Sequence, residues 1–153
     1  MGLLNRIEEL EKELLELKEQ VKEQQEFPQD GDSFYSISET GNIEGGMIWG
    51  GYPVDMDRMA IGNIFQTKEQ AEFAVEKLKV ETELRKFSRP FKHGAKNHTI
   101  NYNHETEMVV NVNATATYQE TGSFYFDSYE EVVEAIESIG EERIKKYIFG
   151  VEE

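Results

Sequence analysis

The 153-residue sequence contains no cysteine, only three prolines and one tryptophan, and about half as many basic as acidic residues. The absence of cysteine excludes disulfides, thiolate metal sites, iron–sulfur clusters and cysteine nucleophiles. The chain also has no apolar run near the roughly 18 residues that a membrane span requires, and its charged, leucine-rich N-terminal stretch lacks the apolar core of a signal peptide. We therefore expect a cytoplasmic protein without a membrane partner.

Acidic residues dominate the charge, with 31 Asp and Glu against 16 Lys and Arg and a net charge of −15. Such a chain is not expected to bind DNA or RNA, because a negative surface repels phosphates unless its basic groups are segregated. One stretch is segregated in this way. Residues 84–98, LRKFSRPFKHGAKNH, here called the basic segment, contain five Lys or Arg, two histidines and no carboxylate.

Apolar residues near the N-terminus recur at alternating steps of four and three: Leu3, Ile7, Leu10, Leu14, Leu17 and Val21. This heptad period is typical of a coiled coil, and mostly β-branched a positions with leucine at d favour two strands. In a parallel pair, the flanking positions join Arg6 with Glu11 and Glu13 with Lys18, which are opposite charges. We expect residues 1–26 to be an oligomerisation helix that favours a homodimer. A trimer, a dimer of dimers and a helix packed on its own domain are the alternatives.

Residues 27–33 include Pro28 and Gly31 and are expected to form a linker. Beyond it, the stretches FQTKEQAEFAVEKL from Phe65 and FDSYEEVVEAIESI from Phe126 align without a gap, and each contains a helix-capping pattern. Helices are predicted over 68–87 and 129–139, with a short helix at EERIKKY. We predict an α+β domain over 34–153, built from two similar halves (34–87 and 99–147), in which an antiparallel sheet packs on two helices.

Two stretches of the domain carry specific expectations. A hairpin with a three-residue loop at 105–107 would pair Tyr102 with Val110 and Asn101 with Asn111, and would gather asparagine and threonine side chains on the face away from the core. Residues 44–58, EGGMIWGGYPVDMDR, are expected to be a loop because four glycines surround Trp49. That tryptophan is interpreted either as a core residue or as part of a binding site.

No pattern in the sequence predicts catalysis. A serine in a strand–turn–helix motif and a histidine placed by a recognisable partner are both missing. His93, His98 and His104 are spaced by five and six residues, which is not the spacing of a helical metal-binding pair. We expect a protein that is not an enzyme and that has neither a cofactor nor a metal.

The basic segment has two interpretations. In the first, Arg85 and Lys86 oppose the negative end of a helix dipole, and a soluble loop follows. In the second, the segment binds an anion of nucleotide size, with cations on the phosphates and rings stacked on a base. The predicted ligand-binding residues are then Arg85, Arg89, Lys92, His93, Lys96, His98, Phe91, Trp49, Tyr52 and Arg58.

Three stretches, DGDSFYSISETGNI, GNIFQTKEQAEFAVEKLKVETELRKF and FDSYEEVVEAIESIGEERIKKYIFGV, resemble a widespread group of small phage and prophage proteins, mostly without assigned activity. The resemblance implies a phage-encoded protein in the cytoplasm of the host bacterium. Some small phage proteins act as sponges that bind a defence nucleotide without cleaving it, and the chain is similar to these in class. We therefore expect sequestration of a nucleotide-derived immune signal of cyclic ADP-ribose type. The alternatives are an acidic protein that inhibits a host defence enzyme by nucleic-acid mimicry and a structural or assembly adaptor.

Overall fold

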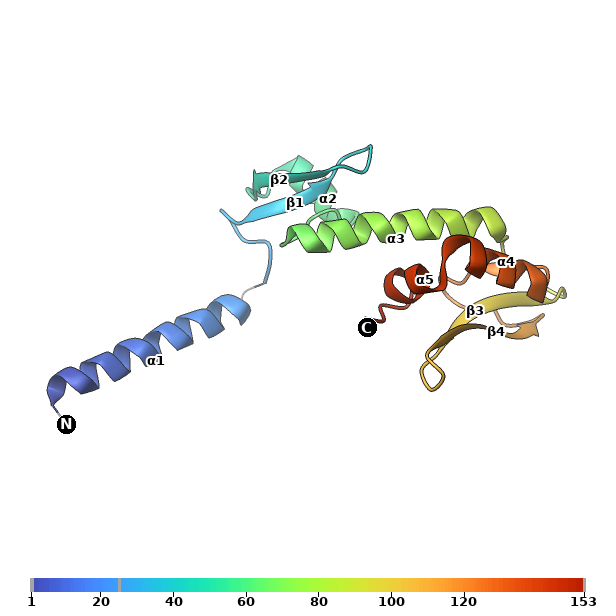
Figure 1. Cartoon of the computed structure of the whole chain (residues 1–153). Helices are drawn as coiled ribbons and strands as arrows, with labels where there is room; N and C mark the ends of the chain where they lie inside the picture. The colour runs from blue at the N-terminus through green and yellow to red at the C-terminus, as the bar shows by residue number, and fades with distance from the viewer. Residues whose placement is uncertain (1, 25, 153) are drawn as a thin grey trace. The chain divides into compact units, whose positions relative to one another are not determined.

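The computed structural model describes residues 2–24 and 26–152, which fall into two compact units. Unit 1 comprises the residues up to Lys68 except 39–41, and unit 2 comprises 39–41 and the residues from Glu69 onward. Figure 1 shows the order of the elements along the chain. In unit 1 they are α1 (Leu3–Gln24), β1 (Ser33–Ile37), β2 (Ile43–Ile48) and α2 (Pro53–Ala60). From the unit boundary onward they are α3 (Lys68–Phe87), β3 (Asn97–Asn103), β4 (Met108–Thr115), β5 (Tyr125–Phe126), α4 (Tyr129–Ile139) and α5 (Glu141–Tyr147).

The α+β class predicted from the sequence is confirmed, and the strands form two antiparallel sheets. In unit 1, β1 pairs with β2, and the backbone of Phe65 bonds to that of Tyr35 at 2.8 and 2.9 Å. In unit 2, the strand order is β4-β3-β5. The division into residues 1–26, 27–33 and 34–153 and the two similar halves stay predictions.

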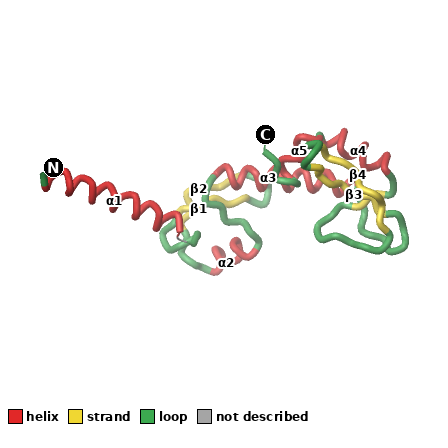
Figure 2. Tube along the Cα trace, turned by 90° about the horizontal axis from the view of Figure 1, so that it is seen from below, coloured by secondary structure: helices red, strands yellow, loops and turns green. Residues whose placement is uncertain are grey.

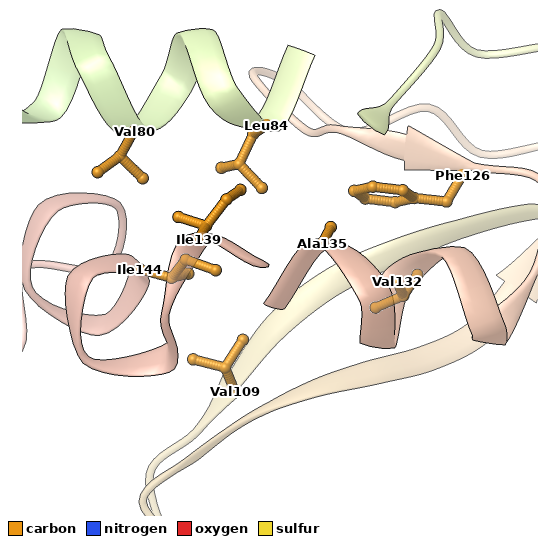
Figure 3. Close-up of a cluster of buried hydrophobic side chains, with 8 residues drawn as sticks. All are labelled: Val80, Leu84, Val109, Phe126, Val132, Ala135, Ile139 and Ile144. Carbon is orange, nitrogen blue, oxygen red and sulfur yellow. The ribbon is translucent and has the colours of Figure 1, made fainter. Parts of the chain in front are cut away.

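The core of unit 2 forms where α3, α4, α5 and the three-stranded sheet meet. Figure 3 shows apolar side chains from all of these elements pointing into one cluster, and Figure 2 shows how the helices and strands alternate along the chain. The buried members are Val80, Leu84, Val109, Phe126, Val132, Ala135, Ile139 and Ile144. Removing this apolar surface from water is the main favourable term in holding the unit together.

Polar contacts fix the helices around this core. Ser128 caps α4 by accepting a hydrogen bond from the Glu131 N–H at 3.2 Å, as the capping pattern predicts. The Arg143 guanidinium of α5 donates to both carboxylate oxygens of Glu83 on α3 (2.9 and 3.0 Å), and this hydrogen bonding lowers the pKa of the Glu83 carboxyl. The Glu141 carboxylate accepts the Val109 N–H at 3.0 Å and joins α5 to β4.

The predicted register of the second hairpin was wrong by one residue. Tyr102 lies opposite Val109, and Asn101 lies opposite Val110. The loop is four residues long, from 104 to 107, and its last residue, Glu107, adopts a φ of 56°. A shift of one residue exchanges the two faces of a strand. Val109 is therefore buried instead of Met108, and the expected face of asparagine and threonine side chains does not form.

The expectation that residues 44–58 form a loop was also wrong in large part. This stretch contains most of β2 and the first six residues of α2, so that only residues 49–52 connect the two elements. Pro53 begins α2, and the Asp55 carboxylate accepts the N–H groups of Gly50 and Tyr52 at 3.1 and 3.3 Å. Proline in the first turn and a carboxylate two residues later are ordinary start signals of a helix, and here they prevailed over the glycines.

Candidate functional site

The basic segment runs from the end of α3 to the start of β3 in unit 2, and the structure gives its cations different environments. Arg85 lies in the last turn of α3 and pairs with Glu81 at 3.3 Å, with 60% of its side chain exposed. Lys92, His93 and Lys96 are exposed in the connection to β3. Arg89 differs from all of these, because only 13% of its side chain is exposed.

Arg89 organises the connection between α3 and β3. Its Nε donates to the Asp127 carboxylate, Nη1 donates to the Pro90 carbonyl and to the Asn97 side chain at 2.9 and 2.7 Å, and Nη2 donates to the Lys96 carbonyl at 3.1 Å. The hydrogen bond from Arg89 lowers the pKa of the Asp127 carboxyl. A guanidinium has five N–H groups, and the bonds to Asp127, Pro90, Asn97 and Lys96 use four of them.

Asn97 completes this network from the buried end of β3. Its side-chain oxygen accepts from Arg89 and from the Lys92 N–H (3.0 Å), and its amide nitrogen lies 2.9 to 3.0 Å from the carbonyls of Lys92, Ala95 and Thr115. Arg89 and Asn97 therefore have a structural reason for their positions, independent of any ligand. This network could not be predicted from local sequence patterns, because Asp127 lies 38 residues from Arg89 along the chain.

An open groove of about 710 Å³ lies beside the end of α3, and we call it the cationic groove. It is lined by Lys77, Glu81, Arg85, Ser88, Arg89, Pro90, Gly122, Ser123, Phe124 and Ile148. Three cations and one carboxylate give this groove a positive balance within an acidic chain. Its volume lies in the range of about 300–1,000 Å³ that is usual for small-molecule sites.

A smaller pocket of about 220 Å³ adjoins the cationic groove, and we call it the side pocket. The two share Gly122, Ser123, Phe124 and Ile148 in their walls. The remaining lining of the side pocket combines aliphatic and aromatic residues with polar ones: Leu84, Ile100, Asn101, Thr121, Ile144 and Phe149. An anionic group in the groove and an apolar ring in the pocket would thus be neighbours.

Two of the ten predicted ligand residues, Arg85 and Arg89, line the cationic groove. Phe91 instead packs edge-on against Tyr125 at 5.3 Å between ring centres. His98 belongs to β3, where it pairs with Phe126, and its Nδ1 atom is buried without a hydrogen-bond partner among the described residues.

Trp49, Tyr52 and Arg58 belong to unit 1. The Trp49 side chain is buried and packs edge-on against Phe34 with ring centres 6.4 Å apart, so its environment is that of a core residue. Tyr52 is 68% exposed, whereas Arg58 pairs with the buried Asp55 at 3.4 Å.

Several residues that line the groove were not predicted from the sequence, and only some of them follow a pattern that could have identified them. Lys77 and Glu81 were missed, yet they precede the predicted Arg85 by eight and four residues on α3, and this spacing places all three on one face of the predicted helix. Phe124 and Ile148 reach the same wall only through the tertiary fold.

The six predicted oligomerisation residues all lie on α1, and each is strongly exposed in the single chain. Their exposed fractions run from 47% to 85%, for Leu3, Ile7, Leu10, Leu14, Leu17 and Val21. Six large apolar side chains left in water on one helix are unusual in a soluble monomer.

In the part of the chain that the structure describes, no group of three His, Asp or Glu side chains is arranged to hold a metal ion. Within the same residues, no helix has both the length and the apolarity that crossing a membrane requires. Comparison with protein-family models, with curated proteins and with solved structures finds no match.

Proposed function

We propose that the protein is a phage-encoded homo-oligomer that sequesters a nucleotide-derived signal in the host cytoplasm and releases it unchanged. The observation that supports this proposal best is the convergence of Lys77, Arg85 and Arg89 on a groove that adjoins the side pocket. Charged nitrogen donors bind phosphate oxygens strongly, and a pocket lined by apolar side chains together with a few polar ones suits a base. The ligand class, cyclic ADP-ribose derivatives included, comes from the resemblance to small phage proteins.

The charge distribution supports a compact ligand over a polymer. The net charge of −15 repels long polyanions, whereas Lys77 and Arg85 still attract a small anion at short range. Among the described residues, Glu81 is the only carboxylate that lines the groove, and it forms an ion pair with Arg85 at 3.3 Å. Binding without turnover is therefore the simplest chemistry for this lining.

Calorimetric titration of the full chain with ADP-ribose, cyclic ADP-ribose and cyclic dinucleotides tests the proposal, with chromatography of the ligand after release. We expect binding, recovery of intact ligand and a loss of affinity of about tenfold for Lys77→Gln or Arg85→Gln. Lys79→Gln is the matched control, because Lys79 is exposed on the same helix, pairs with Glu76 and does not line the groove.

Three results would contradict the proposal in different ways. Absence of binding at high micromolar ligand would refute sequestration of these nucleotides. A cleaved product would show that the protein is an enzyme. If Lys92→Gln and Lys96→Gln abolish binding while Lys77→Gln and Arg85→Gln do not, the ligand binds the exposed part of the basic segment instead of the groove.

Mimicry of nucleic acid is the second candidate function, and the excess of acidic residues favours it. An acidic inhibitor would cover the nucleic-acid groove of a host enzyme, and its binding would weaken steeply with salt. Lys77→Gln with Arg85→Gln separates the two functions, because a mimic would keep its activity and a sponge would lose it.

A further inference from the structure

The exposed apolar face of α1 requires a partner, and the sequence of α1 indicates which one. With Ile7, Leu14 and Val21 at a, the d positions are Leu3, Leu10 and Leu17. All six side chains are at least 47% exposed. A heptad face of this composition is complementary to a second copy of itself, because a and d side chains insert between those of the facing helix.

We infer that α1 pairs with α1 of a second copy in a parallel, in-register, two-stranded coiled coil. The inference rests on the proposed homo-oligomer and adds its stoichiometry and direction. The charges at the positions that flank the apolar face determine the direction of pairing. These are Arg6 and Glu13 at g, and Glu11 and Lys18 at e.

In a parallel pair, each g residue faces the following e residue of the partner. Arg6 then meets Glu11, and Glu13 meets Lys18, each twice by symmetry. Within the single helix, Arg6 pairs with Glu9 at 3.1 Å, and both side chains are at least half exposed. Exposed pairs of this kind contribute little, so Arg6 is free to face the partner.

An antiparallel pair with the same apolar layers has the opposite electrostatics. Setting Ile7 against Leu17 and Leu14 against Leu10 brings e positions to e positions and g positions to g positions. Glu11 then faces Glu11 of the second copy, and Glu13 faces its own counterpart. These like charges disfavour the antiparallel arrangement, while the parallel one has opposite charges at both places.

Adjacent leucines offer a matched test of the interface. Leu14 is at a, whereas Leu15 is at b and points away from the seam, although the two are similarly exposed at 52% and 59%. Sedimentation equilibrium of the full chain should give twice the mass of 17.7 kDa. Leu14→Ser should reduce this mass to that of a monomer at micromolar concentration, and Leu15→Ser should leave the dimer intact.

Because the chain has no cysteine, disulfides between single introduced cysteines show whether the two helices run parallel or antiparallel, with no interference from native thiols. Leu3→Cys places two d-position thiols face to face only in a parallel dimer, within the span of a disulfide. In glutathione buffer we expect the Leu3→Cys homodimer and no mixed product with Val21→Cys. Arg6→Glu should weaken the dimer about tenfold, and adding Glu11→Arg in the same chain should restore it.

Each other outcome is informative. A mixed disulfide between positions 3 and 21 overturns the parallel direction, and a mass of three or four chains overturns the two-stranded coil. A monomeric wild-type chain refutes self-association itself. Nucleotide titration of Leu14→Ser keeps the two proposals apart, since the groove belongs to unit 2 and a monomer with an intact groove should still bind.

Discussion

Replacing Asn97 by alanine should destabilise unit 2 by about 3 kcal/mol. The Asn97 side chain is fully buried; its oxygen accepts two hydrogen bonds, and its two N–H groups donate to three nearby carbonyls, so that it connects β3, β4 and the 89–96 connection. A net hydrogen bond contributes roughly 0.5–1.5 kcal/mol, and a bond to a charged group contributes more. Alanine removes all of these hydrogen bonds at once, although Arg89 and Lys92 regain some bonds to water, so the total stays below the simple sum.

Urea unfolding of the full chain, followed by far-ultraviolet circular dichroism, measures this loss. With a slope of about 2 kcal/mol per molar, the midpoint should fall by roughly 1.5 M. Asn101→Ala is the control, because Asn101 lies half-buried on the same strand outside the network. Its midpoint should change by less than about 0.3 M, which corresponds to the usual effect of a surface substitution.

Hydrogen exchange distinguishes a local effect from a general one. In Asn97→Ala, the amides of residues 91–96 should exchange faster than in the wild type even where the protein remains folded, because their anchor is lost. A destabilisation below about 1 kcal/mol, together with unchanged exchange in this connection, would refute the view that Asn97 and Arg89 hold the basic segment in place.

Two further predictions concern the same unit. Acid should destabilise the protein, because hydrogen bonds from Arg89 and Arg143 lower the pKa values of Asp127 and Glu83 in the folded state. The stability that these pairs contribute is present above the unfolded-state pKa of about 4 and is lost as the pH falls through the lower folded-state pKa. Asp127→Asn should flatten the acid limb of stability measured by urea unfolding, and an unchanged limb would contradict the pairing. Phe126→Ala should lower stability by about 3–5 kcal/mol, since Phe126 is fully buried in the cluster of Figure 3, whereas Tyr129→Ala at an exposed position should change it by less than about 0.5 kcal/mol in the same assay.

Local signals were sufficient to predict the helices of unit 2. Ser128 caps the start of α4, and Gly140, with a φ of 103°, marks its end. The helix therefore spans the predicted residues 129–139. The strand register depended on a weaker signal. Met108, Val109 and Val110 are all apolar, so alternation fits either face of β4, and the length of the preceding loop decided between them.

The candidate site was predictable only in part, because its contacts join residues that are distant in the sequence. A cluster of cations can be read from the sequence, but whether each cation is free depends on its partners. Arg85 was expected at a helix end and lies there, on the wall of the groove. Arg89 has the same charge four residues later, yet most of its donors are taken by groups up to 38 residues away.

The two phenylalanines that align in the predicted repeat occupy similar topological positions. Phe65 pairs antiparallel with β1, the first strand of the first hairpin, and Phe126 pairs antiparallel with β3, the first strand of the second. Each is followed within three residues by a long helix, α3 or α4. In unit 1 the pairing is a single bridge, whereas in unit 2 it is a two-residue strand with a buried Phe126. The repeat itself stays a prediction. If each half consists of a hairpin, a third paired strand and a helix, this common order would explain why the same capping pattern occurs twice in the sequence.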